Sequence, residues 1–522
     1  MFTLRKKYVR DGSFVKLTNS SQMREMDRYA IEGLGIPGTA LMLNAAQHIA
    51  DAAMELLPSG GSAAVFCGTG NNGGDGIGCA SFLMDKGIHV RVFLVGSAEK
   101  LTPDSREMVG RFNSRGGLIE RFAVSDELIS HLRDCDVIVD AIVGIGLNSG
   151  LQGDALLAAK LINDSGARVI AADIPTGVSA DTGAVMGEAV RADITITFSL
   201  AKQGHYIEPG STRCGELRVC DIGIPSEVVD SAVSHVYAVT RDDISLQSRR
   251  HDTHKGNYGR CLIVAGSTGY TGAPALSARA ASRMGAGLVF LGVPKSIYNT
   301  MAVKLDEEMP FPLPEDNYGR LAANAAGEVM RRADACDVCL IGPGLGRSQD
   351  ITELVLSAIR IVKAPVILDA DGINAISGHV EILDQAACPL ILTPHAGEFI
   401  RLGGNLTYGD RLREARMFAT KHRCALVLKG HRTITALADG TAFINTSGGP
   451  AMAKGGTGDV LAGMIAALVG QKIPISTAVH TAVYLHGLAG DMCADERGDY
   501  SVTAGDIIAM LPKATRQFIQ LK

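Results

Sequence analysis

Residues 447–463 read SGGPAMAKGGTGDVLAG, a glycine-dense turn that runs directly into an apolar helical stretch. Glycines at 455, 456 and 458 allow the backbone to approach a phosphate closely, and the helix that follows presents free N–H groups and a positive dipole end to an anion. Asp459 stands at this helix start. As a helix cap such a carboxylate is ordinary, but beside a polyphosphate it is also placed to take a proton from a hydroxyl. The turn therefore predicts either a capped helix or a phosphate site with a general base.

The chain as a whole has the composition of a globular protein of more than one domain. Its 522 residues exceed a single core, and 46% of them are apolar while 20% are charged. A net charge of −5 without a long basic stretch argues against a nucleic-acid partner. No apolar run reaches the ~18 residues that a membrane span needs. The eleven cysteines are scattered through apolar runs, which is typical of reduced thiols and predicts a cytoplasmic protein.

Both halves alternate apolar β-rich runs with amphipathic helical stretches, the pattern of α/β architecture with parallel sheets. A polar segment without strong periodicity, 224–256, separates them, and we place the boundary near 238, giving domains 1–237 and 238–522. Predicted strands of the first half lie near 63–67, 90–95, 136–143, 168–172, 192–198 and 216–220, with helices at 20–34, 38–57, 75–87 and 154–165. Predicted strands of the second half lie near 260–265, 287–292, 336–341, 365–369, 389–393, 424–429, 432–437 and 441–445, with consecutive helices at 456–469, 475–494 and 503–511.

The first half contains a second glycine turn, GTGNNGGDGIG, directly after the predicted strand 63–67. Turns at the carboxyl ends of strands are where α/β sheets bind nucleotides. Here Asn71, Asn72 and Asp75 replace a plain glycine turn, and their hard oxygen atoms suit an alkali or alkaline-earth cation as well as a phosphate neighbourhood. The turn predicts a nucleotide site, a cation site, or both.

Two further carboxylates, Asp140 and Asp173, end later predicted strands of the first half. A single aspartate at a strand end is an ordinary turn former. The ends of parallel strands share one edge of a sheet, so we expect Asp75, Asp140 and Asp173 to converge on a site.

The first half resembles the YjeF N-terminal domain, the NAD(P)H-hydrate epimerase family, which has a Rossmann-like three-layer sheet. The matching segments are QMREMDRYAIEGLGIPGTALMLNAA (22–46), GNNGGDG (70–76), DAIVGIGL (140–147), DIPTGV (173–178) and GHYIEPG to DIGIP (204–225). The resemblance implies that the hydrated nucleotide contacts Asn71, Asn72, Gly73, Gly74, Asp75, Gly144, Ile145, Gly146, Leu147, Asn148, Ser149, Gly150 and Asp173. It also implies a K⁺ ion held by Asn72, Asp140 and Thr176, and we expect Asp173 to be catalytic.

Two positions depart from that family's pattern. Leu43 stands in LMLNA where the family has an acidic residue, and Asn148 stands where some relatives carry a lysine. If that lysine serves in catalysis elsewhere, the epimerase of this chain is weaker or uses another acid.

The second half carries five further motifs in a fixed order. They are a strand, glycine turn and helix in 254–287, IGPGLGRS (341–348), ILDADGINAI (367–376), LTPHAGEF (392–399) and VLKGHRT (427–433). Each has a structural explanation when taken singly, because His395 could cap a helix, Asp369 and Asp371 could form turns, and Lys429 could be solvated. Together with the GTGD turn, their order favours a nucleotide site.

This set resembles the NAD(P)H-hydrate dehydratase family, a branch of the ribokinase-like fold. The resemblance implies that the adenine nucleotide, with Mg²⁺ and as ADP or ATP, is held by Lys429, Gly430, His431, Arg432, Thr433 and Gly458. It implies contacts to the hydrate from Ala273, Gly346, His395 and Asp459. One departure lies near Lys454, where relatives often have a second small residue.

The two resemblances predict a metabolite-repair enzyme whose substrates are hydrated NADH or NADPH and ADP or ATP, and we expect a homo-oligomer. Asp459 is expected to remove the proton of the substrate hydroxyl, and Lys429 to bind the phosphoryl donor. Two alternatives stay open from the residues alone. The second half could be a kinase for a small alcohol, fused to a nucleotide-binding module, and the first half could bind without catalysis.

Overall fold

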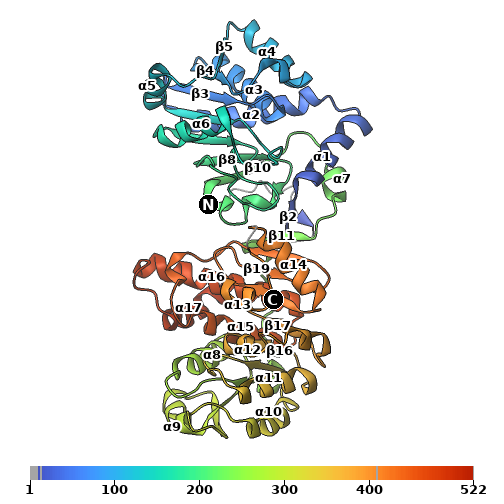
Figure 1. Cartoon of the computed structure of the whole chain (residues 1–522), viewed down its shortest axis with the longest axis vertical. Helices are drawn as coiled ribbons and strands as arrows, with labels where there is room; N and C mark the ends of the chain where they lie inside the picture. Colours follow the sequence, from blue (N-terminus) through green and yellow to red (C-terminus); the bar gives the residue numbers. More distant parts are fainter. Residues whose placement is uncertain (1–9, 12–13, 407–408, 521–522) are drawn as a thin grey trace. The chain divides into compact units, whose positions relative to one another are not determined.

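The computed structural model describes residues 10–11, 14–406 and 409–520. The chain divides into two compact units, Met1–Tyr237 and Ala238–Lys522. Each unit is a predominantly parallel β-sheet covered by helices (Figure 1), so the predicted α/β class is confirmed. Among the described residues, no helix is both long and apolar enough to cross a membrane.

The sheet of the first unit has seven strands, and all neighbouring strands are parallel. Their order is β10-β8-β7-β6-β3-β4-β5, so the chain leaves β3 toward one edge and returns to β6 to build toward the other. Such a reversal opens a crevice at the carboxyl ends of the two central strands. The strands are β3 (Ser62–Cys67), β4 (His89–Leu94), β5 (Ile119–Arg121), β6 (Val137–Ala141), β7 (Arg168–Ala172), β8 (Ile194–Phe198) and β10 (Glu216–Cys220).

Helices cover both faces of this sheet because its strands are apolar on both sides. Phe66 of β3 packs into a core with α5 and α6, whereas its neighbours in the strand, Val65 and Cys67, face Gly76 of α3 on the opposite side. The helices are α1 (Ser20–Arg28), a π-helical turn (Tyr29–Gly33), α2 (Gly38–Leu56), α3 (Asn71–Asp85), α4 (Pro103–Ser114), α5 (Asp126–Asp134), α6 (Gly153–Asp164) and α7 (Ser226–Ser231). The short strands β1 (Arg10–Asp11), β2 (Phe14–Thr18), β9 (Ala201–Lys202) and β11 (Val236–Val239) complete this part of the chain.

Helix α3 begins four residues earlier than the predicted helix 75–87, so the NNGGD segment is helical. A Cβ atom at Gly73 would lie 1.9 Å from the carbonyl oxygen of Gly68. The first turn of α3 therefore packs directly on the backbone that leaves β3, which only glycine permits. Because the segment is polar and rich in glycine, its sequence has the appearance of a loop.

The sheet of the second unit follows the order β20-β19-β18-β17-β16-β15-β12-β13-β14. Neighbours are parallel from β18 through β14, and β19 and β20 add two antiparallel strands. The order reverses between β12 and β15, which again opens a crevice at their carboxyl ends. The strands are β12 (Arg260–Val264), β13 (Leu288–Pro294), β14 (Met309–Leu313), β15 (Val338–Ile341), β16 (Val366–Leu368), β17 (Leu390–Leu392), β18 (Ala425–Leu428), β19 (Ile434–Ala436) and β20 (Ala442–Asn445).

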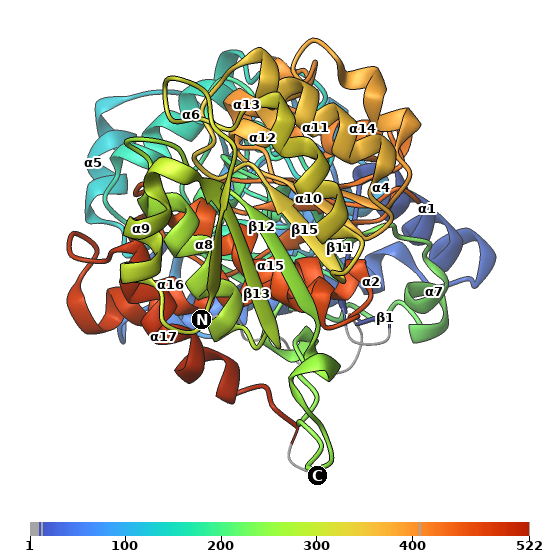
Figure 2. The same ribbon diagram turned by 90° about the horizontal axis from the view of Figure 1, so that it is seen from below.

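The helices of the second unit lie on both sides of β12, β13 and β15 (Figure 2). Helices α8 and α15 pack against each other so closely that a Cβ atom at Gly463 would lie 2.1 Å from the carbonyl oxygen of Ser277. The predicted run of three consecutive helices is found as α15, α16 and α17. The helices are α8 (Gly272–Arg283), α9 (Lys295–Lys304), α10 (Ala326–Ala333), α11 (Gln349–Ile361), α12 (Asp371–Ala375), α13 (Ala396–Arg401), α14 (Arg411–Lys421), α15 (Thr457–Gly470), α16 (Ile475–Arg497) and α17 (Ala504–Arg516).

Candidate functional site

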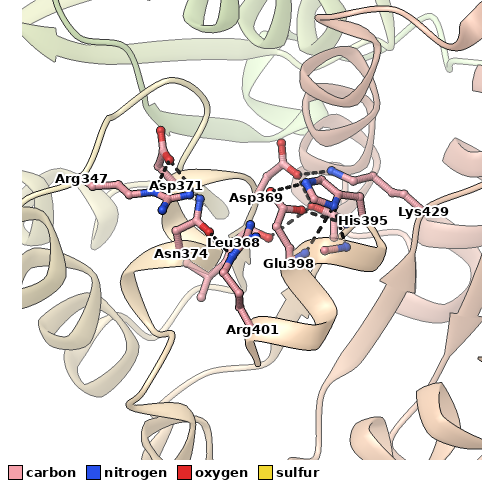
Figure 3. Close-up of polar contacts among 11 residues, drawn as sticks. Arg347, Leu368, Asp369, Asp371, Asn374, His395, Glu398, Arg401 and Lys429 are labelled. Carbon is pink, nitrogen blue, oxygen red and sulfur yellow. Dashed lines mark hydrogen bonds and ion pairs between the residues drawn. The ribbon is translucent and has the colours of Figure 1, made fainter. Parts of the chain in front are cut away.

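The site of the second unit is built around a lysine–aspartate pair at the ends of two strands (Figure 3). Lys429 follows β18 and Asp369 follows β16, and the Lys429 Nζ lies 2.7 Å from the Asp369 Oδ1. Asp369 is buried and also accepts a hydrogen bond of 2.7 Å from the Thr393 hydroxyl. Burial alone would lower the pKa of Lys429, but the carboxylates of Asp369, Glu398 and Asp459 raise it above its ordinary value. The ammonium therefore stays charged.

Asp459 lies in the first turn of α15, close to this ion pair. Burial and the charge of Asp369 raise the pKa of Asp459 to about 7, against the opposing charge of Lys429. The helix is preceded by Gly456 in the left-handed conformation (φ 93°). A Cβ atom at Gly458 would lie 3.4 Å from the Lys429 Nζ, so the glycine turn passes beside the ammonium. A carboxyl group that titrates near neutrality can serve as a general base.

His395 caps helix α13, which is the structural role that the sequence suggested for it. Its Nδ1 accepts hydrogen bonds from the backbone N–H groups of Gly397 (3.0 Å) and Glu398 (3.3 Å). The backbone of His395 also pairs with that of Lys429 in an isolated parallel bridge. Its side chain remains 55% exposed, and Figure 3 shows the ring beside Lys429 and Asp369. The Nε2 lies 3.5 Å from the Glu398 Oε1, so both ring nitrogens face groups of α13 while part of the ring stays exposed.

The two other residues implied to contact the hydrate lie on either side of the β12–β15 crevice. A Cβ atom at Gly344 would lie 3.1 Å from the Cβ of Ala273, so the turn after β15 touches the start of α8. The N–H of Gly346 donates a 2.9 Å hydrogen bond to the Asp371 Oδ2. A cavity of about 320 Å³ is lined by Gly346, Asp371 and Asn374. The charge of Asp371 also raises the pKa of Asp459, so this carboxylate acts electrostatically on the GTGD turn.

The segment implied to hold the adenine nucleotide, Lys429–Thr433, forms the turn between β18 and β19. The Thr433 hydroxyl donates a 2.8 Å hydrogen bond to the carbonyl oxygen of Gly430. Arg432 adopts a positive φ of 56°, and its Nη1 donates to the Thr446 carbonyl at 3.0 Å. The Thr433 side chain therefore closes the turn, and the Arg432 guanidinium binds the segment that follows β20. Lys429 is the residue of this turn that lies beside the glycine turn.

The first unit contains a second buried lysine–aspartate pair. The Lys202 Nζ lies 2.6 Å from the Asp173 Oδ1 and 2.8 Å from the Thr197 hydroxyl. Burial alone would raise the pKa of Asp173, but the charge of Lys202 holds it below its ordinary value. The Nε2 of His205 lies 2.9 Å from the backbone oxygen of Asp173, which adopts a positive φ of 67°. Backbone strain of this kind concentrates at functional sites.

Two more carboxyl groups, Asp75 and Asp27, act on this pair electrostatically. Burial raises the pKa of Asp75 well above its ordinary value, and the charges of Asp173 and Asp27 add to the effect. Burial also raises the pKa of Asp27 to about 6, against the charge of Lys202. Three carboxyl groups and one ammonium cannot all be charged here at low cost, so the protonated form of Asp75 is favoured. Sequence reasoning identified Asp75 and Asp173 but missed Asp27 and Lys202; the available signal was a lysine in the apolar run FSLAK.

The loop that follows β6 reaches both the NNGGD helix and Asp173. With its amide oriented to suit its neighbours, Asn72 donates to the Ala172 carbonyl (3.1 Å) and accepts from the Gly144 N–H (3.3 Å). A Cβ atom at Gly144 would lie 3.2 Å from both the Asn72 side-chain amide group and the Asp173 Oδ2. The structure therefore brings together residues from three of the predicted substrate segments.

Asp140 is placed differently from the other two strand-end carboxylates of this unit. Its Oδ1 accepts from the Thr176 hydroxyl (2.7 Å) and its Oδ2 from the Thr176 N–H (2.8 Å). The side chain is fully buried, and burial raises its pKa to about 6. None of the described residues forms an ion pair with it. Asp75 and Asp173 thus act on each other, while Asp140 forms a separate polar site with Thr176.

Two parallel-sheet units, each with a glycine turn and a buried lysine–aspartate pair at the strand ends, define a two-domain enzyme that acts on nucleotides. The family described as YjeF-related protein N-terminus matches residues 38–204, and that described as NAD(P)H-hydrate dehydratase matches residues 261–513. A solved ADP/ATP-dependent NAD(P)H-hydrate dehydratase from Bacillus subtilis is 31% identical, covering 52% of this chain and 95% of that one with a TM-score of 0.45.

Curated relatives match nearly the whole chain. The bifunctional NAD(P)H-hydrate repair enzyme Nnr of Thermofilum pendens is 40% identical over 509 residues, and that of Moorella thermoacetica is 38% identical over 516 residues. Each alignment covers 96% of this chain and 96% of the relative. The chain belongs to the family of bifunctional NAD(P)H-hydrate repair enzymes, and both resemblances drawn from the sequence are confirmed.

Proposed function

We propose that this chain repairs hydrated NADH and NADPH in two steps. The first unit interconverts the R and S forms of the hydrate, and the second dehydrates the S form to NAD(P)H at the expense of ADP or ATP. The observation that carries the proposal is the full-length match to bifunctional relatives, with a polar site at the sheet reversal of each unit. The boundary near 238 would separate the two activities.

Dehydration requires that a poor leaving group be made a good one. Hydrated NADH carries a hydroxyl at C6 of the nicotinamide ring. Transfer of the terminal phosphoryl group of ADP to that oxygen releases AMP, and Asp459 accepts the hydroxyl proton. The lone pair of the ring nitrogen then expels phosphate, and loss of a proton from C5 restores the C5–C6 double bond. Alignment and charge neutralisation are the main tasks of the protein in such a transfer.

Lys429 and the glycine turn would supply that charge neutralisation. The ammonium lies beside Gly458, and the N–H groups that open α15 face the same space. A phosphate there would be bound by one full charge and by the helix N-terminus. Mg²⁺ would accompany the nucleotide, because a polyphosphate carries more negative charge than Lys429 offsets. Ala273, Gly346, His395 and Asp459 would contact the hydrate.

Epimerisation at C6 can proceed by opening of the ring. The C6 hydroxyl loses its proton as the N1–C6 bond breaks, N1 gains a proton, and the aldehyde recloses on its other face. One group must accept a proton and another must donate one. Lys202 favours the ionised form of Asp173 and burial favours the protonated form of Asp75, so these two residues suit the roles of base and acid. We assign these two roles to Asp173 and Asp75, with Lys202 stabilising the developing oxyanion.

The polar site around Asp140 fits a K⁺ ion. A fully buried carboxylate without an ion-pair partner gains most from a cation, and the Asn72 amide and the Thr176 hydroxyl offer further oxygen atoms near the same strand ends. The ion would hold the NNGGD helix and the loop after β6 in register. A homo-oligomer and a cytoplasmic location are also proposed; the latter is supported by the eleven cysteines scattered through apolar runs, as is typical of reduced thiols.

The proposal is tested by incubating the full chain with mixed R and S hydrates, ADP or ATP, Mg²⁺ and K⁺, and following each epimer by chromatography. We expect consumption of both epimers, recovery of NADH absorbance and release of one phosphate per NADH formed. A phosphorylated alcohol that accumulates without NADH would instead identify a kinase. Consumption of only the S form would show that the first unit does not epimerise.

A further inference from the structure

A buried histidine at the site of the second unit has no part in the steps above. His486 lies on α16 and is only 8% exposed. Among the described residues, its Nε2 has no hydrogen-bond partner. Buried polar atoms are nearly always paired, so an unpaired ring nitrogen beside a ligand site needs an explanation.

The surroundings of His486 place it next to the phosphate site. Helix α16 packs on α15 and on β18, the strand whose end carries Lys429. Burial lowers the pKa of His486 to about 4, and the charge of Lys429 lowers it too, against a hydrogen bond to the backbone of Thr457. That bond favours a proton on the ring nitrogen facing Thr457. The imidazole is therefore neutral, and its Nε2 is a hydrogen-bond acceptor.

Helix α16 is fixed against the segment that leads into the GTGD turn. The Ser447 hydroxyl donates to the Tyr484 carbonyl (2.7 Å), and the Gly448 N–H donates to the Asp491 carboxylate (2.8 Å). A Cβ atom at Gly487 would lie 2.3 Å from the Ser447 Oγ, so any other residue there would separate the two segments. The part of α16 that carries His486 is thus held at a set position relative to the glycine turn.

We propose that His486 is a positioning residue for Lys429, whose ammonium it holds through Nε2 when a nucleotide is bound. An ammonium has three N–H donors. In the present structure one of them is bound by Asp369 at 2.7 Å. A phosphate oxygen takes the second, and His486 takes the third, which directs the ammonium toward the phosphate instead of leaving it to rotate. A neutral acceptor does this without competing for the charge, as a second carboxylate would.

This inference rests on the proposed function only in the identity of the nucleotide, so binding of ADP to the full chain tests it without the hydrate. We expect His486→Leu to weaken ADP binding about tenfold by calorimetry, because the variant lacks an acceptor. His486→Gln keeps one and should stay within about threefold of the unmodified protein. His480→Leu is the matched control: it removes another buried imidazole of α16, packed at a tilt against Phe443 (4.9 Å between ring centres), and should leave ADP affinity unchanged.

A double-mutant cycle separates positioning from packing. If His486 acts through Lys429, His486→Leu should cause no further loss in a Lys429→Met background. Equal losses in both backgrounds, or an unchanged ADP affinity of His486→Leu, would overturn the proposal. If His486→Leu does not fold, His486→Met replaces it with the same expectations against His486→Gln. A chain that binds ADP as expected but never converts the hydrate would refute the proposed function and leave this inference standing.

Discussion

The Nζ of Lys429 lies 2.7 Å from the Oδ1 of Asp369, although the two residues are 60 positions apart and come from strands separated by β17. This ion pair sets the charge of the whole site. Asp369 keeps the ammonium protonated, and its own charge helps to raise the pKa of Asp459 toward neutrality. Phosphate binding and proton removal are therefore coupled through one buried carboxylate.

The first prediction concerns the general base. Asp459→Asn should lower the dehydratase kcat by ~10²–10⁴ while ADP affinity stays nearly unchanged, because the amide keeps the shape but cannot accept a proton. Steady-state kinetics and calorimetry on the same preparation measure both quantities. In the unmodified protein, a pKa of about 7 means that kcat/KM falls as the pH drops below that value, since only the ionised carboxylate is active. An Asn variant with full turnover would remove Asp459 from this role.

The second prediction follows from the coupling. Asp369→Asn removes a negative charge near Asp459, so the pKa of Asp459 should fall and the acid limb of the kcat/KM profile should move to lower pH. The same change frees Lys429, and we expect ADP binding to weaken. Glu353→Gln, an exposed neutral substitution on α11, serves as the control and should move neither quantity. An acid limb at the same pH in Asp369→Asn would show that the carboxylate at 459 titrates independently.

A site residue could be predicted from the sequence when its role depends on its neighbours in the chain, and not when it depends on contacts between distant segments. Asp459 and Asp173 were identifiable, because each stands at a glycine turn after or before an apolar run. The partners Lys202 and Asp369 were not recognised as partners, since ion pairing depends on which strands become neighbours and on what each side chain faces. Asp27 was missed for the same reason, because it lies on α1, far from the strand ends in the chain.

The sequence did not predict local structure correctly where its signals conflict. The NNGGD segment has the composition of a loop but forms the first turn of α3. Its glycines are needed there because Gly73 packs so closely on the backbone of Gly68 that a side chain would not fit. Strand β14 reads MPFPL, and its two prolines conceal a strand. It is an edge strand, where missing N–H donors are tolerated.

The third prediction separates the two activities. Lys202→Met should abolish interconversion of the hydrates while dehydration of the pure S form continues, since Lys202 belongs to the first unit alone. It also leaves the buried Asp173 carboxylate without its counter-charge, which costs about 3–5 kcal/mol of unfolding free energy. The double variant Lys202→Met, Asp173→Asn should melt at a higher temperature than Lys202→Met, because no uncompensated charge remains. If Lys202→Met melts at the same temperature as the unmodified protein, Lys202 and Asp173 do not form a buried ion pair.

The fourth prediction tests the cation site. Asp140 is fully buried, binds Thr176 through both oxygens, and lacks an ion-pair partner among the described residues. Adding K⁺ in place of Na⁺ should therefore raise the melting temperature of the first unit and speed epimerisation, because an ion that binds only the folded state stabilises it. Asp140→Asn should lose both responses while the S-form dehydratase is unaffected. Potassium titrations followed by thermal melting and by epimer exchange measure them separately, and a variant that still responds to K⁺ as the unmodified protein does would place the ion elsewhere.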